Sequence, residues 1–269
     1  MPIKLKCPAC DLPLQPRQTG WVCDNGHQFD RAKRGYTHLL LPQHMRSKSP
    51  GDDKAMVLAR QRFLQRDRYA PLMHAIDQLI VGTPHQWLDL GCGEGWYTEQ
   101  LAQRLGAENG IGLDISKPAV DMAARRLKAL TWLVASGARM PVFDQQLDAV
   151  FVMFTRLFPE ELHRTLRGDG HLYVVGTGED HLMPLRQALY DQVRQSPFDA
   201  ATHLSDRFTL LHCHSLRFSW QPEDHQELTD LLAMTPHQWR TSPESHQRLS
   251  SLVGQPMNAH FELQCWQPR

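Results

Sequence analysis

Three cysteines and one histidine near the amino terminus have the spacing of a metal site. Two residues separate Cys7 from Cys10, twelve separate Cys10 from Cys23, and three separate Cys23 from His27. One pair of thiolates can hold one side of a tetrahedral ion while a second pair of ligands closes the other side. The spacing therefore predicts a zinc site formed by Cys7, Cys10, Cys23 and His27. Because four protein ligands leave no open coordination position, we expect a structural rather than a catalytic ion.

A glycine-rich segment in the middle of the chain predicts a site for a nucleotide-type cofactor. Residues 88–95 read LDLGCGEG and place Gly91, Gly93 and Gly95 at alternate positions. Glycines at such a turn let the backbone bend sharply and approach a ligand closely. Asp114 follows Gly95 by nineteen residues, at the end of the next apolar run. Its carboxylate is placed to accept hydrogen bonds from ribose hydroxyls.

The exact glycine spacing separates two classes of enzyme. A dehydrogenase would more often show the pattern GxGxxG. Here the pattern is GxGxG, and the acidic residue Asp89 stands two positions before the first glycine. These features resemble the S-adenosylmethionine site of class I methyltransferases, so we favour a methyltransferase over an enzyme that uses NAD.

Alternating strand and helix patterns must position these residues. Short apolar runs predict buried parallel strands at 87–90, 111–114, 132–135, 149–154 and 172–175. The segments between them predict helices near 97–105, 118–127 and 160–166. This order is typical of an α/β fold with a doubly wound, Rossmann-like sheet. Towards the carboxyl terminus we expect helices near 182–193, 227–234 and 244–252, and two late strands within 208–220 and 259–266.

The chain before the predicted sheet has a different character. Residues 1–46 are rich in turns and short of core-forming residues, so we interpret them as a small zinc ribbon that the metal holds together. Residues 47–82 then form a linker and two helices that break near Asp67, with Asp52 expected to cap the first of them. Residues 83–269 form the predicted methyltransferase domain.

The charges are unevenly distributed along the chain. The whole sequence of 269 residues has a formal net charge of zero, with 41% hydrophobic and 22% charged residues, which disfavours a disordered or membrane protein. Residues 1–70, however, carry 13 Lys and Arg against 6 Asp and Glu. This excess of positive charge favours an RNA-facing module, in which Trp21, Phe29 and Tyr36 could stack on bases. Two alternatives are an unevenly charged but merely solvated surface, and a ribbon core built from Trp21 and Phe29.

Over nearly its whole length the chain resembles the guanine-N1 methyltransferases of large-subunit (23S) ribosomal RNA. The resemblance rests on the order of several motifs rather than on any one of them. These motifs are the zinc ligands, QFD at 28–30, GY at 35–36, PGD at 50–52, the segment 63–72, LGCGEG at 90–95, HLM at 181–183 and MTP at 234–236. The segment TRLFP at 155–159 departs from the family, which usually has an Ala-Pro pair after its fourth strand.

The resemblance implies an activity and a set of site residues. A zinc ribbon would grip a hairpin of 23S ribosomal RNA, and the body would transfer a methyl group from S-adenosylmethionine to N1 of a guanine. Tyr69, Gly93, Glu94 and His181 match the family's cofactor contacts. No residue is assigned as the general base, and Arg156, after the fourth strand, is our candidate for steadying charge on the guanine O6. Whether the enzyme works as a homodimer is left open.

Two other functions are compatible with parts of the sequence. The protein could methylate a small molecule or a protein, with the zinc ribbon serving protein contact. It could also be a zinc-dependent RNA-binding protein whose body no longer binds a cofactor, although the intact Gly91, Gly93, Gly95 and Asp114 argue against this. The amino terminus lacks the apolar stretch of a secretory signal, so we expect a cytoplasmic protein.

Overall fold

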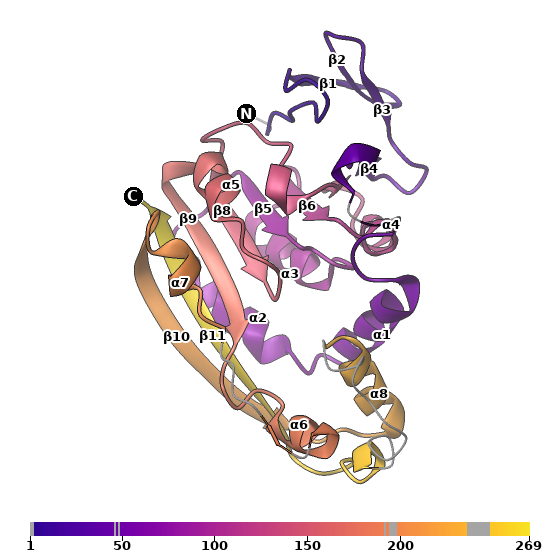
Figure 1. Cartoon of the computed structure of the whole chain (residues 1–269), viewed down its shortest axis with the longest axis vertical. Helices are drawn as coiled ribbons and strands as arrows, with labels where there is room; N and C mark the ends of the chain where they lie inside the picture. Colours follow the sequence, from indigo (N-terminus) through magenta and orange to yellow (C-terminus); the bar gives the residue numbers. More distant parts are fainter. Residues whose placement is uncertain (1–2, 46, 48, 191, 194–197, 236–247) are drawn as a thin grey trace.

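A mixed eight-stranded sheet forms the centre of the fold (Figure 1). The computed structural model describes residues 3–45, 47, 49–190, 192–193, 198–235 and 248–269. The strand order is β10-β11-β9-β8-β5-β6-β7-β4. The strands are β4 (Thr37–His38), β5 (Trp87–Leu90), β6 (Gly110–Asp114), β7 (Thr131–Val134), β8 (Leu147–Met153), β9 (Leu166–Thr177), β10 (Phe208–Trp220) and β11 (Met257–Pro268). Neighbouring strands from β4 to β9 pair in parallel, whereas β11 is antiparallel to both β9 and β10.

The sheet separates two apolar cores because successive side chains of a strand point to opposite faces. Trp87 and Phe151 pack into one core, whereas their neighbours Leu88 and Val150 pack into the other. Of the helices that lie wholly within the described residues, those that contribute buried residues to the first core are α1 (Lys54–Leu64), α2 (Ala70–Leu79), α3 (Trp96–Leu105), α4 (Lys117–Arg126), α6 (Met183–Leu189) and α8 (His225–Ala233). The second core receives α5 (Pro159–Thr165) and α7 (Ala201–Leu204).

The amino-terminal ribbon also covers the second core. Its antiparallel strands are β1 (Leu14–Arg17), β2 (Gly20–Cys23) and β3 (Gln28–Asp30), which lie at the top of Figure 1. The connection from β7 to β8 contains one short turn of 3-10 helix, η2 (Gly137–Arg139), and leaves this part of the sheet open. Leu5 pairs with Val142 here, and Leu14 joins the same apolar cluster. The ribbon thus takes the place of a covering helix.

The structure confirms most predicted elements and corrects several details. The five parallel strands and the helices between them lie where the sequence placed them. The cap of α1 was assigned wrongly, because Asp53 rather than Asp52 accepts a hydrogen bond from the Met56 amide. The predicted boundary after residue 46 assigns β4 to the ribbon, although β4 pairs with β7 of the body. Residues 244–247 of the helix predicted near 244–252 lie outside the described residues.

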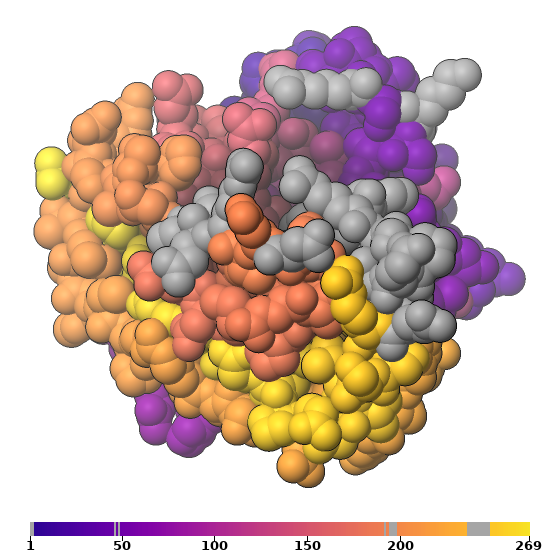
Figure 2. Space-filling view, turned by 60° about the horizontal axis from the view of Figure 1, so that its bottom comes forward, coloured from indigo at the N-terminus to yellow at the C-terminus, as the bar shows by residue number. Residues whose placement is uncertain are grey.

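Within the described part of the chain, no helix is long and apolar enough to cross a bilayer. Viewed from the lower end of Figure 1, the orange residues around α6 gather beside the yellow carboxyl-terminal residues (Figure 2). This agrees with the packing of α6 against β11.

Candidate cofactor cavity and metal centre

The predicted zinc ligands converge on one point. Their ligand atoms all lie within 4.8 Å of one another. Cys10 Sγ lies 3.6 Å from Cys23 Sγ, and His27 Nδ1 lies 3.4 Å from Cys23 Sγ and 3.7 Å from Cys7 Sγ. Tetrahedral ligands about 2.3 Å from a zinc ion would be roughly 3.8 Å apart. The donor set therefore fits a structural zinc ion that is held by four protein ligands.

Two tight turns present the thiols to this point. The Asp11 amide donates to the Cys7 carbonyl oxygen at 2.9 Å, and the Gly26 amide donates to the Cys23 carbonyl oxygen at 2.8 Å. Asp11 and Gly26 have left-handed backbone angles, with φ of 59° and 79°. Short turns of this kind hold a ligand pair in position before the metal binds.

A cavity of about 530 Å³ lies at the carboxyl ends of the parallel strands. Ligands of doubly wound folds bind at this edge of the sheet. Six of the eight predicted cofactor residues line the cavity: Tyr69, Gly91, Gly93, Glu94, Asp114 and His181. The other two, Asp89 and Gly95, are not part of the lining. The turn between β5 and α3 and the end of β6 therefore line one cavity.

The three glycines of the turn have different roles. Gly91 has φ of +78°, and a Cβ atom there would lie 2.6 Å from Thr155 Cγ2. Gly95 has φ of +84°, and its Cβ would lie 2.9 Å from Ala123 Cβ. Both positions thus need glycine for backbone shape and for close packing. At Gly93 an added Cβ would meet only the Arg60 guanidinium, at 3.6 Å, so this part of the backbone opens onto the cavity.

Asp114 fixes the turn from the end of β6. One carboxylate oxygen accepts the Gly93 amide at 3.0 Å, and the other accepts the Ser116 amide at 2.7 Å. Each carboxylate oxygen can accept a further hydrogen bond. Asp114 can therefore hold the turn and still bind the ribose hydroxyls of a cofactor.

Buried acidic groups give the cavity its electrostatic character. Asp89 and Glu94 are each 1% exposed. Among the described residues, Asp89 Oδ1, Glu94 Oε1 and the Tyr97 hydroxyl are buried without a hydrogen-bond partner. Unpartnered buried polar atoms are costly in a folded protein. Glu94 and Tyr97 line the cavity, so a cationic ligand there would compensate their unpartnered atoms. S-adenosylmethionine carries both a sulfonium and an ammonium charge, so these residues fit that cofactor.

The raised pKa of Asp89 predicts that the stability of the folded chain depends on pH. This pKa is raised to about 7, mainly by burial and also by the charges of Asp114 and Glu94, against the opposing effect of a hydrogen bond from Thr98. Because the unfolded value is about 4, the folded chain binds a proton that the unfolded chain lacks between about pH 4 and 7. Stability should fall as the pH rises through this window, and Asp89→Asn should remove that contribution.

Thermal unfolding of the wild type and the Asp89→Asn variant from pH 5 to 8 measures the effect. The wild type should lose stability relative to the variant by about 1.4 kcal/mol per pH unit up to about pH 7, and little beyond it. Titration of the zinc ligands cancels because both proteins carry them. Parallel stability curves across this range would show that Asp89 is ionised throughout.

Tyr69 and His181 are held by their neighbours. Tyr69 is 2% exposed, and its ring packs edge to face on Phe63 and Phe261, with centroids 5.2 and 5.1 Å away. Burial raises its pKa, which keeps the hydroxyl protonated. His181 Nδ1 accepts the His260 backbone amide at 3.2 Å, so a neutral His181 carries its proton on Nε2. Both side chains are thus fixed as hydrogen-bond donors at the cavity wall.

Two cavity residues were not identified as such from the sequence. Arg60 was counted among basic surface residues, but its guanidinium lies in the cavity and pairs with Asp52 at 2.5 Å. Phe154 follows β8 with a left-handed φ of 57° and is 43% exposed. Its ring packs on Phe261 with a centroid distance of 5.3 Å. Strained, exposed residues of this kind concentrate at functional sites, but no sequence pattern marks the backbone angle of Phe154.

The predicted catalytic candidate Arg156 lies elsewhere. It is exposed, is not part of the cavity lining, and its guanidinium lies 5.5 Å from the centroid of the Phe158 ring. At this end of β8, Phe154 and Thr155 line the cavity instead. The structure therefore does not bring Arg156 to the site.

The basic residues of the first 70 positions do not form one RNA-facing surface. Arg62 pairs with Asp230, and Arg66 and Arg68 share the buried Glu227. Both acidic residues lie within α8. Together with Arg60, these arginines are used in contacts within the chain. Among the described residues of the ribbon and its following loop, the exposed cations are Lys4, Arg17, Arg31, Lys33 and Arg34. The predicted positive charges at Arg46 and Lys48 lie outside the described residues.

The aromatic residues of the ribbon are similarly divided. Trp21 and Phe29 are partly buried against the second core, as the alternative of a ribbon core predicted. Tyr36 is only 6% exposed and packs in the first core, whereas His38 is exposed. Trp21 and Phe29 therefore contribute mainly to packing, whereas the exposed His38 does not.

The fold and site define a class I methyltransferase that uses S-adenosylmethionine and carries an amino-terminal zinc ribbon. The family described as "RlmA, N-terminal" matches residues 5–48, and the family "Methyltransferase domain" matches residues 88–170. The chain belongs to the family of 23S ribosomal RNA guanine-N1 methyltransferases. It is 32% identical to the 23S rRNA (guanine(748)-N(1))-methyltransferase of Streptomyces fradiae, over 93% of this chain and 91% of that protein.

Two further comparisons agree with this assignment. A putative 23S rRNA guanine-N1 methyltransferase of Bacillus subtilis is 34% identical, over 87% of this chain and 86% of its own length. The crystal structure of a putative methyltransferase from Bacillus halodurans superposes with a TM-score of 0.50 and 13% identity, covering 72% of this chain and 97% of that chain. At this identity the last comparison shows the fold alone.

Proposed function

We propose that this protein transfers a methyl group from S-adenosylmethionine to N1 of a guanine in a hairpin of 23S ribosomal RNA. The observation that carries the proposal is the likeness to guanine-N1 methyltransferases, which spans ribbon and body together at 32% identity over 93% of the chain. The buried, unpartnered polar atoms at the cavity support the binding of S-adenosylmethionine. The exposed cations of the ribbon support an RNA substrate.

The chain's own residues would act mainly by positioning. The acidic cavity holds the cofactor, which supplies an activated methyl group on its sulfonium sulfur. Asp114 and Gly93 fix the turn beneath it. Guanine N1 carries a proton and lies inside a base pair, so the base must leave its helix or loop to reach the cavity. Holding the two reactants in line supplies much of the rate of such a transfer.

Phe154 is suited to receive the displaced guanine. Its ring is exposed at the cavity, beside Phe261 and Tyr97. Stacking of a base on an aromatic ring contributes about 1–3 kcal/mol. Because Phe154→Ala removes this stacking energy, it should raise the KM for RNA about 10-fold or more. The affinity for S-adenosylmethionine, measured by calorimetry, should change little, and Phe154→Tyr should restore the KM. A KM unchanged by Phe154→Ala would contradict this role.

The activity itself can be tested with an unmodified 23S ribosomal RNA transcript. Incubation with the zinc-loaded protein and S-adenosylmethionine should yield 1-methylguanosine, detected by mass spectrometry of the nuclease digest. Reverse transcription should stop at the modified base, because N1-methylation removes its Watson–Crick donor. Methylation of another guanine atom would correct the target, and an RNA that stays unmethylated would favour a small-molecule or protein substrate.

Two finer points belong to the same proposal. A ribosomal RNA substrate supports a cytoplasmic location for the protein. The homodimer stays a prediction, and sedimentation of the protein with and without RNA would decide between one and two chains.

A further inference from the structure

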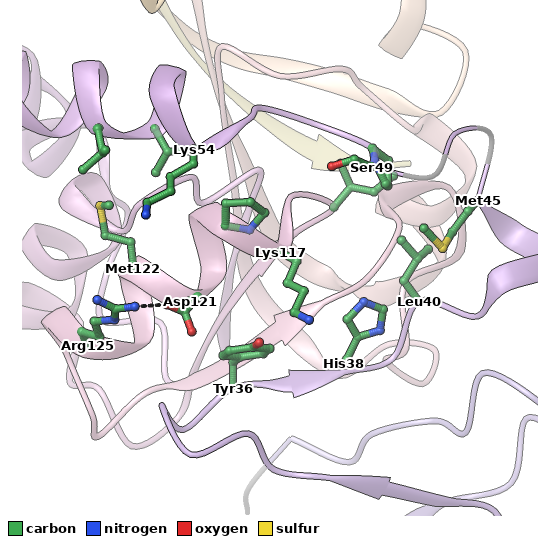
Figure 3. Close-up of a pocket in the computed structure, with 15 residues that line it drawn as sticks. Tyr36, His38, Leu40, Met45, Ser49, Lys54, Lys117, Asp121, Met122 and Arg125 are labelled. Carbon is green, nitrogen blue, oxygen red and sulfur yellow. Dashed lines mark hydrogen bonds and ion pairs between the residues drawn. The ribbon is translucent and has the colours of Figure 1, made fainter.

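A second cavity, of about 500 Å³, lies between the loop after the ribbon and the helices of the body (Figure 3). His38 contributes from β4, Lys54 from the start of α1, and Lys117 and Arg125 from α4. In Figure 3, Lys54 and Lys117 extend into the space between these elements. The cavity is therefore formed jointly by the amino-terminal segment and the methyltransferase body.

The charge of this cavity is positive. Arg125 pairs with Asp121, so these two charges balance. Within the described part of the chain, no ion pair involves Lys54 or Lys117, and both lysines are exposed. Two ammonium groups thus face the cavity outside any ion pair of the described residues, while the one carboxylate of the lining, Asp121, is paired with Arg125. Such a pair attracts an anionic group such as a phosphodiester.

The remaining wall is aromatic and apolar. Tyr36 and His38 line one side, Ser49 adds a hydroxyl, and apart from the charged residues the other lining residues, among them Leu40, Val57 and Met122, are apolar. Partial desolvation by the surrounding wall, followed by the charge of the nearby Lys117, lowers the pKa of His38 and favours its neutral form. A neutral aromatic and apolar wall beside two ammonium groups matches a nucleotide, which combines a flat base with a phosphate.

The second cavity adjoins the cofactor cavity. Ile115 lines both cavities, Pro50 lines the second, and Gly51 and Asp52 line the first. Gly51 has φ of +81°, and a Cβ atom there would lie 2.8 Å from Ser116 Cβ. The Ser116 hydroxyl also donates to the Asp52 carbonyl oxygen at 2.7 Å. The chain between the cavities is thus fixed against the start of α4, and neighbouring nucleotides of one strand could occupy the two sides.

We propose that this cavity binds an unpaired nucleotide of the substrate RNA next to the target guanine. Its base would lie against the aromatic and apolar wall, and its phosphate would lie between Lys54 and Lys117. This proposal rests on the proposed function and specifies how the substrate strand passes from the ribbon to the cofactor cavity. It also explains why the two free ammonium groups face the boundary between ribbon and body.

Steady-state methylation of the 23S transcript tests the proposal with the full-length zinc-loaded protein. The double variant Lys54→Ala/Lys117→Ala should raise the KM for RNA about 10-fold or more, because it removes charge-assisted contacts to a phosphate. The kcat and the affinity for S-adenosylmethionine should be unchanged. The slope of log affinity against log salt should become shallower by about 0.7 for one single-strand phosphate contact.

Two further variants make the test specific. Lys54→Arg/Lys117→Arg retains both charges and should keep the KM near that of the wild type. Lys128→Ala removes an exposed lysine beyond the end of α4 and is the matched control. If the double alanine variant matches Lys128→Ala in KM and salt slope, the proposal is wrong while the proposed function stands. Weakened S-adenosylmethionine binding would also overturn it, and a wild type inactive on RNA would overturn the proposed function itself.

Discussion

Replacing Cys23 with serine is expected to abolish zinc binding and to destabilise the whole chain, not only the ribbon. Cys23 is 3% exposed and lies opposite Leu14 in the pairing of β1 with β2. Both residues belong to the core that includes Leu133 and Val142 of the body. Since zinc binding energy is folding energy in small metal-held modules, losing the ion should release the ribbon and expose this apolar face.

Zinc content by mass spectrometry and thermal unfolding together measure this effect. Zinc per chain should fall from about one to near zero because a four-ligand site loses one thiolate. The unfolding temperature should fall by roughly 10 °C, at about 2–4 °C per kcal/mol for a chain of this size. Cys213→Ser is the control, because Cys213 is exposed on β10, far in sequence from the metal ligands. A zinc-free variant with an unchanged unfolding temperature would mean that packing of the ribbon on the body does not stabilise the body.

Replacing Gly91 with alanine is expected to weaken S-adenosylmethionine binding by about 100-fold or more, which corresponds to about 2.7 kcal/mol. The substitution adds a methyl group 2.6 Å from Thr155 Cγ2 at a backbone angle that disfavours any side chain. To relieve the contact, either the turn after β5 or the segment after β8 must move. Both segments line the cofactor cavity, so either movement distorts the site.

Gly82→Ala separates this contact from backbone strain. Gly82 also has a positive φ, of +66°, but a Cβ atom there would have no neighbour within 4 Å. Both variants should lose about 1–2 kcal/mol of stability from the left-handed backbone. Calorimetric titration should show weakened cofactor binding for the Gly91 variant alone. Equal affinities in the two variants would show that the turn tolerates a side chain and that the close approach to Thr155 is not needed for binding.

The arginines Arg62, Arg66 and Arg68 show what a count of charges along the sequence can predict and what it cannot. Counting charges along the chain correctly separated a basic front segment from an acidic body. It could not show that Arg62, Arg66 and Arg68 pair with acidic residues of that body, more than 150 positions later in the sequence. Charge attraction of this kind depends on distance in space. Part of the apparent RNA-binding charge thus serves to attach α1 and the segment after it to α8 and the residues just before α8.

Local patterns determined the metal ligands, the order of strands and helices, and the glycine turn. They did so because a tetrahedral ion, a buried parallel strand and a sharp backbone turn each require particular residues at short, fixed spacings. The predicted cofactor residues Gly91, Gly93 and Asp114 meet in one cavity because parallel strands bring their carboxyl ends to one edge of the sheet.

Only the tertiary structure decided which distant residues complete these sites. It placed Arg60 in the cofactor cavity, gave Phe154 its exposed position, and removed Arg156 from the site. It also showed that the ribbon covers an open part of the sheet and that Lys54 and Lys117 face one cavity. These features arise from packing between segments far apart in the chain. Sequence spacing carries little information about such contacts, because many side chains of similar size and charge could form them.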